Sequence, residues 1–320
     1  MRILATPSVV SVLNSNSKSI MSFANSLKEV ANNRCFNGYQ KIFEHASAQM
    51  KCQMRFGAFL PDNQQNEHLP VLFYLSGLTC TEENFIVKSG MQKFASDRKV
   101  VVINPDTSPR GVVTGIDDDP NFGAAAGFYL DATEPKWAQN YRMYSYFLEE
   151  LVPLVFGTFS LDKNKCGIFG HSMGGHGALT IGLKHPDLFS SVSVFAPICN
   201  PSKAIVFGQK YLSAFLGDDG DGGKWANYDA TELAKKYNGP KREVLIDQGS
   251  ADPFLDRGEL LPDNLLNVKN PNLTWKYRLQ PDYDHGYFFI QTFIGDHFEH
   301  HLTVGEMIIG NGSSRELFGT

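Results

Sequence analysis

The sequence lacks the cysteine patterns that hold a disulfide framework or a structural zinc ion. It has five cysteines, an odd number, and none of them forms a Cys-x-x-Cys pair. Zinc ribbons and redox motifs need that pair, and small secreted domains use an even set. We therefore interpret most of the five as small buried apolar residues of a protein from a reducing compartment. They are Cys35, Cys52, Cys80, Cys166 and Cys199.

Surplus basic charge and long hydrophobic runs are also missing. The 29 lysines and arginines are outnumbered by 34 acidic residues, which gives a formal net charge of -5. A nucleic-acid-binding domain normally carries a basic surplus, so a nucleic-acid partner is not expected. Apolar runs such as 71–75 and 192–196 are far shorter than the roughly 20 residues of a membrane-spanning helix. We expect a soluble protein without a membrane partner.

Acidic residues are absent from the beginning of the chain, where the first one is Glu29. Residues 1–32 are rich in serine and asparagine and show no strand or helix periodicity, so we expect an unstructured N-terminal extension. A serine-rich segment without acidic residues is also typical of transit peptides, and residues 1–20 would then direct the protein to mitochondria. Translation that starts at Met21 is a third interpretation.

From about Cys35 onward, short apolar runs alternate with helix-like segments. The 320 residues can bury one large core, and the alternation predicts an α/β domain over residues 33–302, a doubly wound, mostly parallel sheet with helices on both faces. Residues 303–320 are expected to be a C-terminal tail. The expected strands are 50–60, 71–75, 100–103, 165–169, 192–195, 244–246 and 274–279, and the expected helices are 84–98, 142–155, 174–184, 230–237 and 287–301.

The most informative motif is Gly-His-Ser-Met-Gly-Gly at residues 170–175. It follows an apolar run, opens a helix-compatible segment and contains the Gly-x-Ser-x-Gly pattern of a nucleophile elbow. The small residues allow a sharp turn from strand to helix, which projects the serine hydroxyl away from the sheet. N–H groups at the start of the helix can then stabilise an oxyanion. Ser172 is therefore the candidate nucleophile of a serine hydrolase with the α/β-hydrolase fold.

Chain order selects the other two members of a catalytic triad. In α/β hydrolases an acid and then a histidine follow the nucleophile, on loops after later strands. The loop 248–253 carries Asp252 at its tip, and this is the candidate acid. Asp247, still on the strand, is interpreted as structural, and Asp256 is the alternative acid. His285 follows the last expected strand and is the candidate base.

Two other features resemble metal sites and are interpreted otherwise. His297, His300 and His301 have a helical spacing but lack the glutamate of a His-Glu-x-x-His zinc motif, and we place them on a late, polar helix face. The acidic, glycine-rich segment 217–223 lacks the later glutamate of a calcium loop and is interpreted as a solvated turn. His176, one turn into the helix after the nucleophile, is expected to point away from its hydroxyl. No metal ion is expected.

Two backbone N–H groups complete the expected site as an oxyanion hole. One belongs to Met173, directly after the nucleophile. The other is expected from the loop after strand 71–75, where Gly77 permits a close backbone approach, so Leu78 is its candidate donor. Cys80 lies two residues further along, near the expected active site. It is either a spectator or a thiol whose modification blocks the acyl pocket.

Seven segments have the sequences SGLTCTEENF (76–85), PDTSPRG (105–111), AGFYLDAT (126–133), NYRMYS (140–145), FGHSMGGHGA (169–178), FAPICNP (195–201) and YDH (283–285). Together they resemble the S-formylglutathione hydrolase, or esterase D, family over nearly the whole chain from Cys35 to His301. The resemblance implies a cytoplasmic, often homodimeric, cofactor-independent serine hydrolase. It would cleave the thioester S-formylglutathione to glutathione and formate during formaldehyde detoxification, with Ser172, Asp252 and His285 as its triad.

The resemblance has departures, and two other functions stay open. Gly286 stands where the family usually has Ser, Asn121 stands where it usually has Asp, and the segment 217–223 is longer than usual. A general carboxylesterase acting on small acyl esters is the alternative enzyme, because such a triad also cleaves activated oxygen esters. A hydrolase-like interaction module would need a broken triad, whereas candidates for all three members are present.

Overall fold

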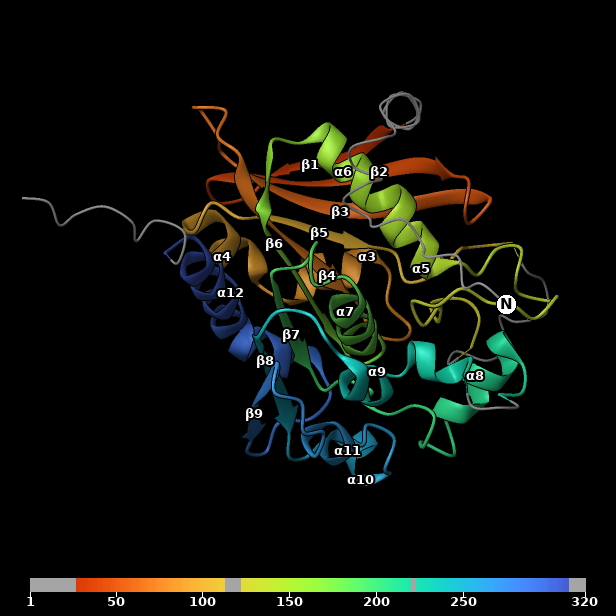
Figure 1. Cartoon of the computed structure of the whole chain (residues 1–320). Coiled ribbons are helices and arrows are strands. Elements are labelled where there is room, and N and C mark those ends of the chain that lie inside the picture. The colour runs from red at the N-terminus through yellow and green to blue at the C-terminus, as the bar shows by residue number, and fades with distance from the viewer. Residues whose placement is uncertain (1–26, 113–121, 220–222, 311–320) are drawn as a thin grey trace, which may run out of the picture.

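A nine-stranded sheet forms the centre of the protein in the computed structural model (Figure 1). The structure describes residues 27–112, 122–219 and 223–310. The strands are β1 (Lys28–Arg34), β2 (Gly38–Ser47), β3 (Cys52–Pro61), β4 (Leu69–Leu75), β5 (Val101–Pro105), β6 (Leu161–His171), β7 (Ser191–Phe195), β8 (Arg242–Gly249) and β9 (Leu273–Gln280). Their order is β1-β2-β3-β5-β4-β6-β7-β8-β9. The pairs from β1 through β3 to β5 are antiparallel, and all pairs from β5 to β9 are parallel.

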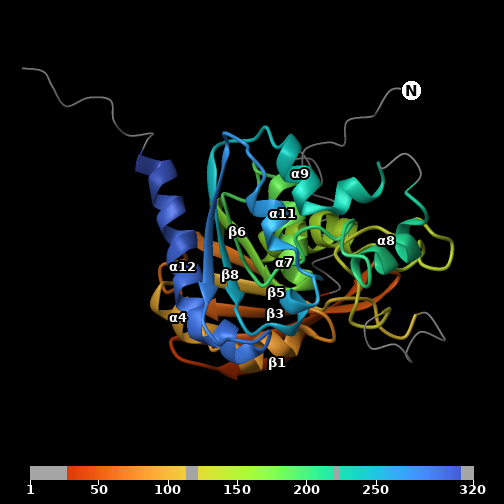
Figure 2. The same cartoon turned by 90° about the horizontal axis from the view of Figure 1, so that it is seen from below.

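Helices cover both faces of this sheet. They are α3 (Glu82–Lys88), α4 (Met91–Asp97), α5 (Met143–Ser145), the π-helical η1 (Tyr146–Leu151), α6 (Val152–Thr158), α7 (Met173–Lys184), α8 (Gly208–Leu216), the 3-10 helix η2 (Trp225–Tyr228), α9 (Ala230–Lys236), α10 (Pro253–Asp256), α11 (Pro262–Leu266) and α12 (Tyr287–Gly310). Figures 1 and 2 show α4 and α12 on one face and α6, α7 and α9 on the other. Every residue of β5 and β7 is buried, as continuous apolar runs require. The predicted α/β fold is confirmed.

Both predicted boundaries of the domain differ from the structure. β1 begins at Lys28, so the prediction of an unstructured extension is wrong for residues 28–32. β1 is mostly polar and almost fully exposed. Backbone pairing with β2 at the sheet edge, rather than burial of an apolar face, holds it in place. α12 continues to Gly310, so the predicted tail 303–320 is helical up to that residue. The remainder of both predicted segments lies outside the described residues.

Two expected helices are interrupted. The segment 84–98 contains two helices, α3 and α4, because Gly90 between them has a φ of 68°, which a helix interior does not allow. The segment 142–155 changes from α5 to the π-helical η1 and then to α6. Within the described residues, no helix combines the length and apolar character needed to cross a membrane.

The topology gathers the loops that carry the expected site. Strands β4, β5, β6, β8 and β9 are parallel, so their carboxyl ends, and the loops that follow, lie at the same edge of the sheet. Ligands of open α/β sheets bind at this edge. Ser172 follows β6, Asp252 follows β8 and His285 follows β9, which brings together residues that are far apart in the sequence.

Candidate active site

Ser172 occupies a sharp turn between β6 and α7. Its φ of 57° and ψ of -119° are rare for a residue with a side chain, and its backbone N–H donates to Phe195 O at 2.9 Å. The side chain is nearly buried, at 7% exposure. The helix can start this close to the sheet because Gly174 has no side chain: a Cβ there would lie 1.9 Å from Leu75 O. The local sequence therefore forms the predicted elbow.

Gly174→Ala is expected to destabilise the protein strongly, because the added Cβ overlaps backbone atoms that cannot move independently. Overpacking of a core typically costs about 1–3 kcal/mol, and a clash with backbone belongs at or above the upper end. Thermal unfolding measures the effect. Gly223→Ala is the matched control, since a Cβ there meets nothing within 4 Å. Equal melting temperatures for the two variants would contradict this packing.

Asp252 and His285 form a buried pair. His285 Nδ1 lies 2.6 Å from Asp252 Oδ2, and the Asp252 side chain is fully buried. The carboxylate also accepts hydrogen bonds from the backbone N–H of Phe254 at 2.8 Å and from Gln248 Nε2 at 2.9 Å. Burial raises the pKa of Asp252, but the bonds from His285, Phe254 and Gln248 outweigh this effect and leave the pKa below its usual value. The acid is therefore ionised at neutral pH and can orient the imidazole.

The His285 ring is held between two other rings. The centroids of Phe254 and His171 each lie 4.5 Å from the His285 centroid. His171 directly precedes Ser172, so this packing brings the imidazole next to the elbow. Burial, and then the neighbouring His285, keep the pKa of His171 well below its usual value. His171 is therefore neutral and adds no charge beside His285.

The loop after β4 lies directly against the elbow. A Cβ on Gly77 would lie 3.1 Å from His171 Nδ1 and 3.2 Å from Ser172 Cβ, so glycine allows the close approach that the sequence predicted. Tyr129 Oη donates to Ser76 O at 3.0 Å and helps to hold the loop. Leu78, the candidate oxyanion donor, is the next residue after Gly77. Met173 is fully buried at the start of α7.

The other acids considered from the sequence occupy different environments. Asp247 is fully buried and accepts hydrogen bonds from Arg278 Nε at 2.6 Å and Nη2 at 2.5 Å, which fits its interpretation as structural. Asp256 is exposed on α10. Of these three acids, it is Asp252 whose side chain is bonded to His285.

The prediction that His297, His300 and His301 lie on a polar helix face is wrong. All three are buried, with exposures of 0%, 7% and 4%. His301 Nδ1 lies 2.6 Å from Ser191 Oγ, and its Nε2 lies 2.9 Å from Ser193 Oγ. Because α12 packs across the middle of the sheet, its polar residues meet hydroxyls that the strands present. Among the described residues, no group of His, Cys, Asp and Glu is arranged to hold a metal ion.

The remaining sequence features are described only in part. His176 is fully buried, with its ring centroid 6.2 Å from that of Tyr211. Asp219 of the acidic segment 217–223 accepts a hydrogen bond from the backbone N–H of Trp225, at 2.9 Å to Oδ1. Residues 220–222 lie outside the described residues. Position 121, one of the family departures, also lies outside them.

Comparison with known proteins decides the family. The Esterase family model matches residues 47–300. The S-formylglutathione hydrolase of Mus musculus is 53% identical over 277 residues, which cover 86% of this chain and 97% of that protein. The chain belongs to the S-formylglutathione hydrolase family. The Arabidopsis thaliana member is 47% identical over 288 residues, covering 89% of this chain and 100% of that protein. The solved Agrobacterium tumefaciens S-formylglutathione hydrolase is 42% identical, with a TM-score of 0.81, and covers 86% of this chain and 99% of that one.

Sequence reasoning missed four side chains that support the site in this member of the S-formylglutathione hydrolase family. Gln248 bonds Asp252, Phe254 and His171 hold the His285 ring, and the Tyr287 hydroxyl lies 3.7 Å from Cys80 Sγ. His171 lies inside the elbow motif, and Gln248 and Phe254 flank the candidate acid, so proximity to the motifs was an available signal. Their contacts depend on loops that meet only in the folded chain.

Alkylation of Cys80 is expected to inhibit hydrolysis, and Cys80→Ser is expected to stay active and become insensitive. The Cys80 sulfur contacts Tyr287, whose ring centroid lies 6.4 Å from that of His171, so an added group would crowd the site. Burial raises the pKa of the Cys80 thiol. The reactive thiolate is then scarcer at neutral pH than for a free thiol, and inactivation should accelerate as pH rises above about 8.5.

Inactivation rates over a pH series, with the labelled peptide identified by mass spectrometry, measure this effect. Cys35 and Cys52 are half-buried and are expected to react as well, so labelling alone does not assign the inhibition. If the Cys80→Ser variant is inactivated at the wild-type rate, another thiol is responsible for the inhibition.

Proposed function

We propose that this chain hydrolyses S-formylglutathione to glutathione and formate. Ser172 acts as the nucleophile, His285 as the base and Asp252 as the acid that orients the base. The observation that carries the proposal is the 2.6 Å bond between His285 Nδ1 and Asp252 Oδ2 beside the Ser172 elbow. It occurs in a chain 53% identical to a mouse protein named for this activity.

Acylation follows from the orientation of His285. Because Nδ1–H is donated to Asp252, the Nε2 lone pair of the neutral imidazole is the base. It takes the Ser172 proton as the oxygen attacks the formyl carbon, and the backbone N–H groups of Leu78 and Met173 stabilise the tetrahedral oxyanion. Collapse of this intermediate breaks the carbon–sulfur bond, and the departing thiolate, whose conjugate thiol has a pKa of about 8.5, takes the proton from the His285 imidazolium, which releases glutathione and leaves His285 neutral.

Deacylation uses the same groups with water in place of the thiol. His285 takes a proton from water, which attacks the formyl-serine carbon to form a second oxyanion. Collapse releases formate, and the imidazolium returns its proton to Ser172. No metal ion or cofactor takes part in this sequence of steps.

Substrate preference tests the proposal against a general carboxylesterase. We expect kcat/KM for S-formylglutathione to exceed that for 4-nitrophenyl acetate by at least about tenfold, equivalent to ~1.4 kcal/mol of additional transition-state binding from the glutathione part. Comparable values for the two substrates would favour the carboxylesterase. Absence of both activities in the folded protein would favour the interaction module.

The assembly and the compartment are further proposals from the family resemblance. We infer a homodimer in the cytoplasm, and the free cysteines of the described structure support a reducing compartment. Light scattering after size-exclusion chromatography tests the oligomeric state. Imaging of the tagged full chain, beside a chain that starts at Met21, tests the cytoplasm against the mitochondrial alternative.

A further inference from the structure

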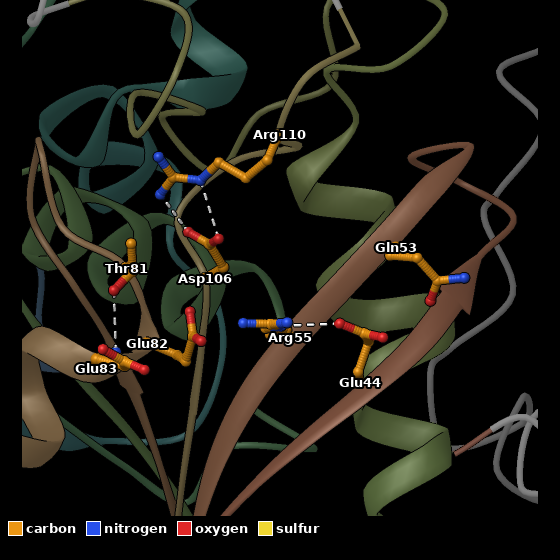
Figure 3. Close-up of a pocket in the computed structure, with 8 residues that line it drawn as sticks. All are labelled: Glu44, Gln53, Arg55, Thr81, Glu82, Glu83, Asp106 and Arg110. Carbon is orange, nitrogen blue, oxygen red and sulfur yellow. Dashed lines mark hydrogen bonds and ion pairs between the residues drawn. The ribbon is translucent and has the colours of Figure 1, made fainter. Parts of the chain in front are cut away.

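A pocket of about 620 Å³ lies beside the candidate oxyanion loop (Figure 3). Thr81 and Glu82 follow that loop along the chain, and Arg110 Nη2 donates to Cys80 O at 2.9 Å, which joins the pocket to it. The pocket therefore borders the same edge of the sheet as the triad. It is lined by Glu44, Gln53, Arg55, Thr81, Glu82, Glu83, Asp106 and Arg110.

Negative charge exceeds positive charge in this pocket. Of its four carboxylates, two are already paired with its two guanidinium groups. Arg55 Nε lies 2.9 Å from Glu44 Oε2, and Arg110 bonds Asp106 through Nε at 3.0 Å and Nη2 at 2.5 Å. The other two carboxylates belong to the first turn of α3 and form no ion pair among the described residues. The pocket therefore holds two carboxylates more than it holds guanidinium groups.

Glu82 is the buried member of this second pair. Glu82 is buried, with 3% of its surface exposed. Figure 3 shows its side chain below Asp106 and beside Arg55, among the residues that line the pocket. The backbone is fixed, since Asn104 Nδ2 donates to Glu82 O at 2.6 Å. Burial, and then the charge of Asp106, raise the pKa of Glu82.

A buried carboxylate without a paired cation is unfavourable, so the pocket is suited to a ligand that brings one. The carboxylates are not arranged to chelate a metal ion among the described residues. An ammonium group, which needs separate acceptors rather than a chelating cluster, fits better. The guanidinium groups of Arg55 and Arg110 line the same pocket, Arg55 next to Glu82 and Arg110 beyond Asp106 (Figure 3), and they suit a carboxylate attached to the same ligand.

We propose that this pocket binds the γ-glutamyl end of the glutathione part of the substrate, with Glu82 accepting hydrogen bonds from its α-ammonium group. The α-carboxylate of the same end then lies beside Arg55 and Arg110. This inference rests on the proposed function, and it assigns the residues that select a glutathione thioester over a simple ester.

The separation between the pocket and the nucleophile is of the same order as the length of glutathione. Ser172 follows β6, and β4 and β5 lie between it and β3, which carries Arg55. At about 4.8 Å per strand, the far side of the pocket lies about 14 Å from the elbow. Glu82 is nearer, on the segment that follows β4. The glutathione sulfur and α-nitrogen are separated by eight bonds, or about 10 Å when extended.

The test compares Glu82→Gln with Glu67→Gln, which removes the same charge from an exposed side chain that does not line the pocket. The substrates are S-formylglutathione and the S-formyl thioester of glutaryl-cysteinylglycine, which lacks only the amino group. A charge-assisted hydrogen bond of this kind corresponds to about 10- to 100-fold in KM, with kcat little changed. Glu82→Gln should show that increase for S-formylglutathione and none for the desamino substrate. Glu67→Gln should change either KM by less than about threefold.

Hydrolysis of 4-nitrophenyl acetate serves as the control for folding and for the triad, and both variants should retain it. Wild-type enzyme that binds both thioesters equally would overturn the proposal without any mutation. Equal loss on both thioesters in Glu82→Gln would overturn it too, by indicating a structural role. In these two cases the proposed function stands. Wild-type enzyme that does not prefer S-formylglutathione over the aryl ester would overturn both proposals.

Discussion

Ser172→Ala is expected to lose about 10⁶-fold in kcat on S-formylglutathione and to lose aryl-ester hydrolysis equally. Without the hydroxyl, no acyl-enzyme forms. His285 then has no nucleophile to deprotonate, and no tetrahedral oxyanion forms for the backbone N–H groups to stabilise. The fold should persist, because the bonds that hold the elbow come from the Ser172 backbone, whose N–H donates to Phe195 O and whose carbonyl accepts from His176 N–H.

Steady-state kinetics measures the loss, and thermal unfolding shows whether the variant is folded. A burst of product in the wild type, absent from the variant, would identify the formyl-serine step directly. A folded variant that keeps even about a tenth of the wild-type kcat would rule out Ser172 as the nucleophile, because catalysis without a nucleophile is far slower.

Asp252→Asn is expected to lower kcat by about 10⁴-fold, as the equivalent change does in serine proteases. The amide can donate a hydrogen bond to His285 Nδ1, which holds the imidazole in the tautomer that cannot act as a base. Kinetics on both substrate classes measures the effect. The loss should appear on aryl esters as well as on the thioester, because the step that fails does not involve the glutathione part.

Asp256→Asn is the matched control for this prediction. Asp256 lies one helical turn from Asp252, on α10, with an exposed side chain. We expect less than about a twofold change in kcat, as for other surface substitutions. The reverse ranking of the two variants would mean that the acid of the triad is Asp256.

Local chemistry explains why much of the fold and site was predictable. The central strands are continuous apolar runs, and their burial on both faces is what such runs indicate. The elbow is encoded within six residues. The absence of side chains at Gly170 and Gly174 allows β6 and α7 to approach closely. The chain order of nucleophile, acid and base then indicated Asp252 and His285, which the structure places 2.6 Å apart.

Features held by long-range contacts were not predictable in this way. β1 is a polar, exposed strand whose stability comes from backbone pairing, so no side-chain pattern marks it. His297 and His301 have the sequence context of a surface helix and are buried only because α12 crosses strands that present the Ser193 hydroxyl. Polar residues in a core are recognisable once their partners are known.

The sequence by itself determined the fold class, the elbow around Ser172 and the order of the candidate triad residues, because each depends on apolar runs or on neighbouring residues. Only the tertiary structure decided which side chains surround those groups. Gln248 reaches the carboxylate of Asp252, Phe254 and His171 enclose the His285 ring, and Glu82 is buried in a pocket without a paired cation. These relations join loops from separate strands, and such distances are set by the packing of the whole sheet.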